Sequence, residues 1–488
     1  MGNVRKHAKI CLVIWLLLFS CVATAQNLAV PDNLMPPGEP SLAGPVYDSI
    51  FVADIIITGN KRTRKEIIQR ELALVPGQRI ATSNLTEYLE QEKNKVFNTD
   101  LFVTVDITPY PAGNDSVLVM VDLLERWYVI PVPLIDFGDR NFNEWWRDRD
   151  RDLGRLEYGF KFKDTNFRGR RESLKLNLLF GFTKNVSLDY RLPFINHNKT
   201  IGLDIGGSYS QNRDIAFKTT GNKLDFASAD RLLIERYNAK LGLTRRSHFY
   251  NTHRVQAAYR NYHIDDSVAL LNPDYLGNGL TRQHYFELTY SFTRDLRDIT
   301  AYPLTGFYLS VLASKMGLGI LNELDAGMLR AEYARFFDIG QNFYYSARFS
   351  GKTSYPQRQP YYLVQALGYS GDIVRGFDLY VIDGQHMLLM QNTLRKKLAS
   401  GRQDISKVMP LKQFSVIPWA LYVRAHFDTG RSWNSVFDPE NTLLDGRTLH
   451  AAGLGLDLVT AYNAVIRVEY SRNDLGENNF FFHYSTSF

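Results

Sequence analysis

The sequence predicts a mainly β protein: a 16-stranded antiparallel transmembrane β-barrel, preceded by one small β-α-α-β-β domain. From residue 128 to residue 488, segments of about ten residues alternate apolar and polar side chains, as in strands that present one face to lipid. Aromatic residues make up 13% of the chain, which suits the aromatic girdles of such barrels. The candidate strands number sixteen, an even count, as antiparallel closure requires.

The first element, residues 1–25, has the pattern of a secretory signal peptide. Three basic residues, Arg5 among them, precede an apolar run, and an A-x-A cleavage motif ends at Ala25. The alternative is a lipoprotein signal that uses Cys21, but bulky Phe19 stands where such signals carry small residues. We therefore expect an exported protein.

Cysteine content and charge exclude several classes of protein. The only two cysteines lie within the signal, so the exported chain would have no disulfide, cysteine nucleophile or cysteine metal site. Without the three basic residues of the signal, 54 Lys and Arg stand against 51 Asp and Glu. A net charge of about +3 does not argue for nucleic acid. No later stretch approaches the length of a transmembrane helix.

A proline-rich leader at 26–48 and a small domain at 49–127 come next. The leader holds five prolines and predicts an extended segment. The strands and helices of the domain are expected at 52–58, 63–74, 83–97, 101–107 and 116–124. Thr63-x-x-Glu66 is a capping box that would begin the first helix, and Pro76-Gly77 would end it.

The remainder, 128–488, is the predicted barrel. Its strands are expected near 128–138, 155–165, 171–182, 184–193, 199–211, 233–246, 252–264, 280–293, 306–316, 325–338, 341–352, 385–397, 413–428, 447–459, 463–472 and 478–488. The long connections fall mostly at one end of these strands, except 398–412, a long turn at the other end. Phe480, Phe482, Tyr484 and Phe488 share one parity, an aromatic terminal strand typical of outer-membrane barrels.

Two motifs carry a family resemblance. The first is Val374-Arg375-Gly376-Phe377, between the eleventh and twelfth strands, and the second is Phe427-Asp428-Thr429-Gly430, in the thirteenth. Weaker motifs are Asn166-Phe167-Arg168-Gly169, Asp295-x-x-Asp298 with Pro303 and Gly306, and Gly453-x-Gly455. Together they resemble the outer-membrane β-barrel assembly superfamily, the BamA- and TamA-like surface antigens, which also includes two-partner secretion transporters. The domain at 49–127 resembles a POTRA domain.

The resemblance implies that the sixth extracellular loop folds back into the lumen and carries the Arg375 motif at its tip. An unpaired guanidinium there would be costly. Strand parity turns Phe427 to lipid and Asp428 inward, so Asp428 is the expected partner of Arg375. The glycine of the motif would allow close approach and its phenylalanine could stack or wedge. The family's second carboxylate is replaced by Thr393, so the contact would be weaker or rest on Asp428 alone. The alternative is that Arg375 is a solvated loop residue.

Prolines mark the seam where the first strand must close on the last. Pro131 and Pro133 remove ladder donors from the first strand, and the last strand ends at Phe488. In the resembled family this seam is a lateral gate at which client strands pair. Two interpretations stand: the seam opens here as well, or the prolines simply precede a shorter first strand.

The resemblance implies an outer-membrane assembly factor that inserts or translocates client proteins, with its N-terminal domain in the periplasm. The expected partners are outer-membrane lipids, unfolded β-barrel or secreted client proteins and accessory lipoproteins. The small domain could receive client strands by β-augmentation or act as a spacer. No cofactor, metal, nucleic acid or enzymatic activity is expected, since no catalytic motif is found. The alternatives are a two-partner-type secretion transporter, a passive outer-membrane channel and, third, an outer-membrane hydrolase.

Overall fold

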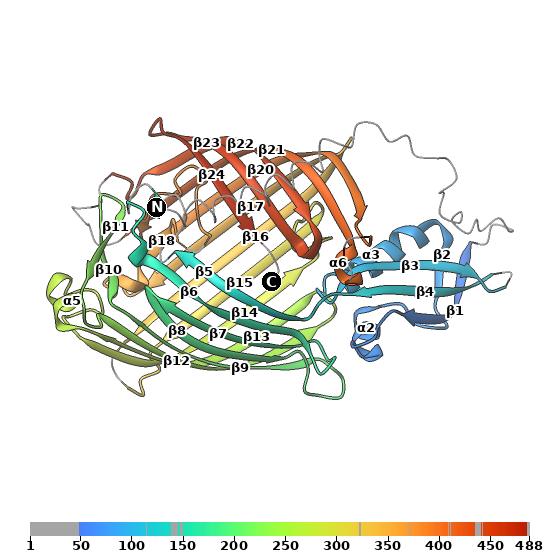
Figure 1. The fold of residues 1–488 in the computed structure, drawn as a ribbon, viewed down its shortest axis with the longest axis horizontal. Coiled ribbons are helices and arrows are strands. Elements are labelled where there is room, and N and C mark those ends of the chain that lie inside the picture. Colours follow the sequence, from blue (N-terminus) through green and yellow to red (C-terminus); the bar gives the residue numbers. More distant parts are fainter. Residues whose placement is uncertain are drawn as a thin grey trace.

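Sixteen antiparallel strands form one continuous sheet that makes the body of the protein (Figure 1). The computed structural model describes residues 48–113, 115–137, 145–146, 150–321, 324–369, 371–407, 409, 411–434, 441 and 443–485. The strands of this sheet, in order along the chain, are β5 (Val129–Phe137), β6 (Leu156–Phe167), β7 (Glu172–Gly181), β8 (Thr183–Leu192), β9 (Ile201–Asn212), β12 (Ile234–Ser247), β13 (Asn251–Ile264), β14 (Arg282–Asp295), β15 (Gly306–Met316), β16 (Ala326–Gly340), β17 (Phe343–Tyr355), β20 (His386–Asp404), β21 (Val416–Trp433), β22 (Thr448–Thr460), β23 (Ala464–Asn473) and β24 (Asn478–Ser485). Each pairs with its neighbour along the chain, so the predicted fold class is confirmed.

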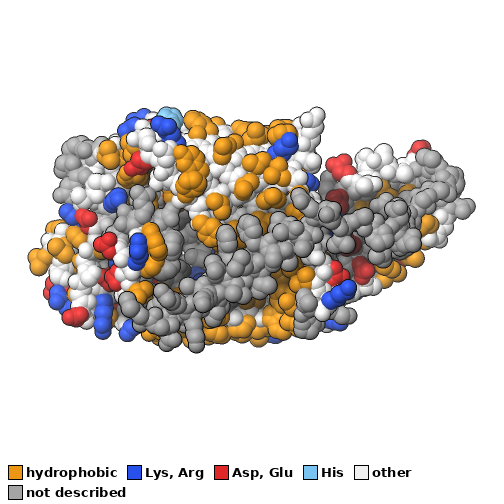
Figure 2. Space-filling view, turned by 45° about the horizontal axis from the view of Figure 1, so that its top comes forward, with side chains coloured by type: hydrophobic (Ala, Val, Ile, Leu, Met, Phe, Trp, Pro, Cys, Tyr) orange, Lys and Arg blue, Asp and Glu red, His pale blue; other side chains and the backbone are white. Residues whose placement is uncertain are grey.

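Burial alternates with period two along these strands. On β21, Arg424, His426 and Asp428 are buried, whereas Phe427 is 51% exposed. Polar side chains therefore line the inner face of the sheet and apolar ones the outer face, the reverse of a water-soluble sheet. Figure 2 shows hydrophobic side chains spread over the wall, with most charged ones gathered toward its two ends. Among the described residues no helix is long and apolar enough to cross a membrane.

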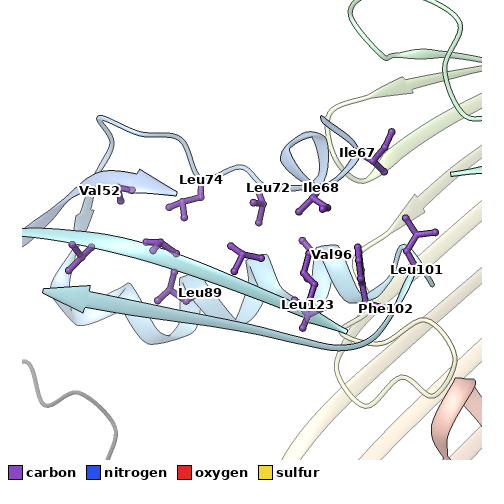
Figure 3. Packing of buried hydrophobic residues seen from close by; sticks show 14 of the residues in the cluster. Val52, Ile67, Ile68, Leu72, Leu74, Leu89, Val96, Leu101, Phe102 and Leu123 are labelled. Atoms are coloured by element: carbon purple, nitrogen blue, oxygen red, sulfur yellow. The ribbon is translucent and has the colours of Figure 1, made fainter. Parts of the chain in front are cut away.

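The N-terminal domain lies at one end of the barrel (Figure 1). Its elements are β1 (Ser49–Thr58), α2 (Lys65–Glu71), β2 (Arg79–Ala81), α3 (Leu85–Phe97), β3 (Phe102–Pro111) and β4 (Ser116–Glu125). The strands pair in the order β2-β1-β4-β3, with β1 parallel to β4. The apolar faces of α2 and α3 pack on one face of this sheet around Val52, Val96 and Phe102, all fully buried (Figure 3).

Two local features of this domain differ from the sequence prediction. Strand β2 was not expected, because three residues are too few to show a period. The capping box does not form: α2 begins at Lys65, and its N-cap residue Arg64 makes no side-chain cap. The Thr63 hydroxyl instead bonds to the Tyr128 hydroxyl and to the Asn166 side-chain amide, both at 2.8 Å. The Thr63 hydroxyl, which the capping box would use to cap the helix, therefore contacts Tyr128 and the barrel residue Asn166.

The connections differ from expectation at both ends of the barrel. The hairpin β10 (Asp214–Thr220) and β11 (Lys223–Ser228) and the helix α5 (Asp266–Leu271) occupy two connections predicted as loops, at the end away from the N-terminal domain (Figure 1). The expected long turn at 398–412 is shorter than predicted, because β20 extends to Asp404 and α6 (Lys412–Ser415) leads into β21. Residues 400–404 are polar on both faces, so period two is invisible there. The expected signal and leader, residues 1–47, and Phe488 lie outside the described residues.

Candidate functional site

The connection between β17 and β20, residues 356–385, is the sixth connection at the end of the barrel away from the N-terminal domain, and is called loop 6. It contains β18 (Gln365–Leu367) and β19 (Ile382–Asp383). Its middle part contacts inward-facing side chains of the wall from β16 to β24. The middle part of loop 6 therefore lies against the inner face of the wall.

Arg375 and Asp428 are brought together at the tip of loop 6. Arg375 Nε donates to Asp428 Oδ2 at 2.7 Å and Nη2 donates to Oδ1 at 2.5 Å. The backbone N–H of Arg375 donates to Oδ2 at 3.1 Å. The Asp428 side chain is fully buried and that of Arg375 is 13% exposed. This two-pronged arrangement is the strongest form of an arginine–carboxylate contact.

Thr393 faces the same guanidinium from β20. Arg375 Nη1 donates to the Thr393 hydroxyl at 3.0 Å, and Nη2 also reaches the backbone carbonyl of Asn392 at 3.3 Å. The contact therefore does not rest on Asp428 alone, contrary to one of the expectations. A neutral hydroxyl takes the place of the second carboxylate, so Arg375 keeps its hydrogen bonds with one acidic partner instead of two.

Two glycines make room for the loop tip. Gly376 has a φ of 108°, which side-chain-bearing residues rarely adopt, and its carbonyl accepts a hydrogen bond from Asn473 Nδ2 at 3.1 Å. Gly430 faces inward from β21, and a Cβ there would lie 2.4 Å from Val374 Cγ2. Because Val374 is buried against this bare backbone, any side chain at Gly430 would displace the tip.

The two phenylalanines of the motifs have different surroundings. Phe377 is buried in an apolar cluster that joins loop 6 to Leu389, Leu444 and Leu449. It is therefore a packing residue of the loop. Phe427 points outward from β21 and stacks on His450, with ring centroids 6.1 Å apart, so it does not contact loop 6.

A second anchor of loop 6 was missed by the sequence analysis. Asp372 accepts a hydrogen bond from Arg330 Nη2 at 2.7 Å and lies 3.6 Å from Arg348 Nη2. Both arginines have the inward parity of β16 and β17, a signal that could have been read. Parity does not predict their acidic partner, Asp372, because it comes from the loop.

A buried charge cluster lies in the wall beneath the loop tip. Arg424 of β21 is fully buried, 3.4 Å from Glu469 and 3.8 Å from Asp457. Arg467 Nε donates to Asp457 at 2.8 Å. A cavity of about 410 Å³ separates this cluster from Arg375 and Asp378. The described residues include no cluster of His, Cys, Asp and Glu that could hold a metal ion.

The seam lies between β5 and β24. Among the described residues, β5 pairs only with β6, and β24 only with β23. The N–H of Thr165 donates to the Tyr128 carbonyl at 3.1 Å. Even-numbered residues of β5 therefore pair with β6, and odd-numbered ones face the seam. Pro131 and Pro133 lie within β5, so they do not precede a shorter strand, and both lack an N–H on the seam side.

The N-terminal domain is bonded to the periplasmic turns of the barrel. Its Arg64 N–H donates to the Gly169 carbonyl at 2.9 Å, and a Cβ on Gly169 would lie 2.1 Å from the Arg62 carbonyl. Asn98 donates to the Asp298 carbonyl at 2.8 Å. Two of the weaker sequence motifs, at 166–169 and 295–306, are therefore contact points for this domain.

Glu71 at the end of α2 is the charged centre of that contact. It is buried, 2.8 Å from Arg246 and 3.3 Å from Arg171, two arginines of the barrel. Burial would raise the pKa of Glu71, but these arginines and Arg70 together lower it below its ordinary value. The carboxylate is therefore ionised at neutral pH and holds the domain against the barrel mouth.

Lipid-facing apolar side chains, a polar lumen and a domain bonded to one rim define an outer-membrane β-barrel protein with its N-terminal domain in the periplasm. The Omp85 superfamily domain profile matches residues 166–488, and this chain belongs to that superfamily. A POTRA profile, described as surface antigen variable number repeat, matches residues 50–126.

Comparison with solved structures finds similar chains at low sequence identity. BamA from Haemophilus ducreyi, lacking POTRA domains 1–3, is 16% identical, with 90% of this chain and 84% of that chain covered and a TM-score of 0.51. CdiB from Escherichia coli is 12% identical, with 93% of both chains covered and a TM-score of 0.49. CdiB from Acinetobacter baumannii is 14% identical, with 90% and 73% covered and a TM-score of 0.46. No curated protein matches the sequence.

Proposed function

We propose that this protein inserts other barrel proteins into the outer membrane, or passes secreted clients across it, by pairing client strands with a free strand edge at the seam. The work is done by binding and strand exchange, without a cofactor or enzymatic chemistry. The observation that carries the proposal is the unequal pair of edges at β5 and β24.

The edge of β24 offers a complete set of backbone groups. The Asn473 N–H donates to the Glu477 carbonyl at 3.1 Å, so odd-numbered residues of β24 pair with β23. The N–H and C=O groups of residues 478, 480, 482 and 484 therefore face the seam. On β5 the facing positions are 129, 131, 133 and 135, and two of these four are prolines. Unpaired backbone groups at membrane depth are costly, so a client strand with all its N–H groups would pair better with β24 than β5 does.

Loop 6 supports one edge of the seam. Tyr380 donates its hydroxyl proton to Glu477, between β23 and β24, at 2.8 Å. His483 of β24 lies 4.0 Å from Asp378 of the loop. Together with the Arg375–Asp428 contact, these contacts brace the wall from β20 to β24. We infer that β24 stays in place and pairs with client strands, whereas β5 separates from it.

The periplasmic domain spans the seam. It bonds to the turn between β6 and β7 on one side, and on the other side Asp100 accepts a hydrogen bond from Asn463, between β22 and β23, at 2.6 Å. Among the described residues, its outer strand β3 pairs only with β4 and leaves an edge without a partner up to Pro109. We propose that this edge receives extended client segments by β-augmentation and delivers them beside β24.

A passive channel is less well supported. Loop 6 occupies the lumen, and its Tyr361 and Tyr362 pack at the extracellular end with an apolar cluster that includes Ile264 and Leu276. The Tyr361 hydroxyl shares a hydrogen bond of 2.8 Å with Thr219 of β10. An open, solute-selective pore would require this cap and the loop to move.

Site-specific photo-crosslinking at the seam tests the proposal. A benzoylphenylalanine in place of Phe482, on β24, should capture newly made barrel or secreted proteins in a pulse and release them in a chase. The same substitution at Leu241, on the lipid face of β12, is the matched control. Equal capture at both positions, or none at Phe482, would contradict strand exchange at the seam.

Depletion of this protein then distinguishes a general assembly factor, a specialised inserter or secretion transporter, and a channel. Quantitative mass spectrometry of outer membranes should show a broad fall of barrel proteins for a general assembly factor, and a fall of one or two species for a specialised inserter or secretion transporter. An unchanged barrel population with reduced uptake of small solutes would favour the channel instead.

A further inference from the structure

The lipid-facing wall carries a groove of about 600 Å³ that crosses β15, β16, β17, β20 and β21. Its strands β21 to β15 lie three to seven strands from β24 along the sheet, away from the seam, and the groove plays no part in the proposed function. Its apolar lining includes Leu309, Ala331, Tyr333, Phe349, Gly351 and Leu388.

The hollow exists because small residues meet in register. Ala331 of β16 pairs with Gly351 of β17, and Gly351 pairs with Leu388 of β20. The larger side chains of Tyr333 and Phe349, which are 40% and 45% exposed, form one side of the groove. Four strand spacings of about 4.8 Å separate β15 from β21, so the groove is about 19 Å long. An extended acyl chain fits such a channel.

One end of the groove is cationic. Arg431 of β21 is exposed and pairs with Leu388 and with Thr448 of β22, both exposed as well. Its guanidinium lies 6.0 Å from the ring of Trp433, the last residue of β21. Because β21 runs from the periplasmic to the extracellular end, Arg431 lies at the level of the outer-leaflet headgroups, where aromatic and basic residues anchor.

Arg431 has no acidic neighbour in the described wall. The ion pairs found among the described residues do not include it, and its partners across the sheet, Leu388 and Thr448, are uncharged. A guanidinium at a membrane interface favours a phosphate, which it can bind with two parallel hydrogen bonds. The groove therefore combines a path for an acyl chain with a cation at its headgroup end.

We propose that this groove binds one anionic lipid of the outer leaflet, with an acyl chain along Ala331 and Gly351 and its phosphate on Arg431. Water is absent from this face of the wall, so the hollow must be filled by hydrocarbon. The charge at Arg431 selects a lipid with net negative charge. The bound lipid would bridge β15 to β21, the part of the wall behind loop 6.

Native mass spectrometry of the full chain in detergent tests this. Phosphatidylglycerol, lipid A and phosphatidylcholine are titrated against the native protein, Arg431→Gln, Ala331→Phe and the control Ala239→Phe. Ala239 is an exposed alanine on the lipid face of β12, so its variant adds the same ring outside the groove. We expect the native chain and the control to retain one anionic lipid at least fivefold more tightly than Arg431→Gln and Ala331→Phe.

The outcomes separate cleanly. Preference for phosphatidylglycerol or lipid A over phosphatidylcholine supports the site, and the better of the two identifies the lipid class. Equal retention of all three lipids, or equal retention by native chain and groove variants, would overturn it. A dimer in place of a lipid adduct would overturn it too and assign the groove to a second copy. If Ala331→Phe fails to fold, Arg431→Gln alone decides, because it leaves the apolar wall unchanged.

Discussion

Replacing Asp428 with Asn should lower the free energy of unfolding by about 3 kcal/mol. The carboxylate is fully buried and accepts three hydrogen bonds from Arg375. Removing one partner of a buried ion pair costs about 3–5 kcal/mol. The lower end applies because Arg375 keeps its bonds to Thr393 and to the Asn392 carbonyl. Arg375→Met should cost a similar amount, since it leaves Asp428 buried without a partner.

The double variant isolates the contact. If the two residues act as one unit, the double variant should cost about 4 kcal/mol, so that a coupling energy of about 2 kcal/mol remains. Unfolding by guanidinium in detergent micelles, followed by tryptophan fluorescence, measures these values. Trp419 and Trp433 lie on β21, the strand of Asp428, so the probe reports on the same wall.

A matched pair away from loop 6 provides the control. Arg260 of β13 and Glu287 of β14 are 2.9 Å apart and also face the lumen, but their side chains are more exposed than those of Arg375 and Asp428. Their cycle should give a coupling below about 1 kcal/mol, as for partly solvated pairs. If the costs of Arg375→Met and Asp428→Asn add to within about 0.5 kcal/mol, the two do not interact energetically, and the account of loop 6 as a pinned element fails.

Three further predictions concern the loop tip, the domain contact and the seam. Gly430→Ala should displace the loop tip and cost about 1–3 kcal/mol through overpacking. Gly242→Ala should cost less in the same unfolding assay, because a Cβ there would lie 3.3 Å from its nearest neighbour, Nε of the long Arg254 side chain, against 2.4 Å at Gly430. Glu71→Gln should increase hydrogen exchange in α2 at neutral pH. In the native chain that contact is fully present above the ordinary pKa near 4.5 and is lost as pH falls through the lowered value; exchange that does not change with pH in the native chain would contradict this. Pro131→Val with Pro133→Val should restore seam-side donors and reduce client cross-linking at the opposite edge, and unchanged cross-linking would show that the prolines do not matter.

The barrel could be predicted from the sequence because lipid imposes a local rule. Every wall strand must alternate apolar and polar residues, so the pattern marks the strands without knowledge of their neighbours. The strand expected at 306–316 is β15, Gly306–Met316. Where both faces are polar, as at 400–404, the rule gives no signal and the extension of β20 was missed.

Part of the candidate site could also be predicted. Parity turned Asp428 inward, and the resemblance supplied the inward loop that carries Arg375. The roles of Thr393 as an acceptor and of Asp372 as a second anchor were not foreseen. Their partners come from segments 18 or more residues away, and sequence spacing does not show which inward row of the wall a loop will reach.

By itself, the sequence determined the class of protein, the faces of its strands and the motif at the tip of loop 6, because each depends on residues close together in the chain. The tertiary structure alone decided which residues from distant segments contact each other. It placed the Thr63 hydroxyl on Tyr128 instead of on the helix it precedes, set Glu71 against arginines 100 and 175 residues away, and turned both seam prolines to the unpaired edge. Such contacts depend on how whole strands and domains are positioned in space, which no local period encodes.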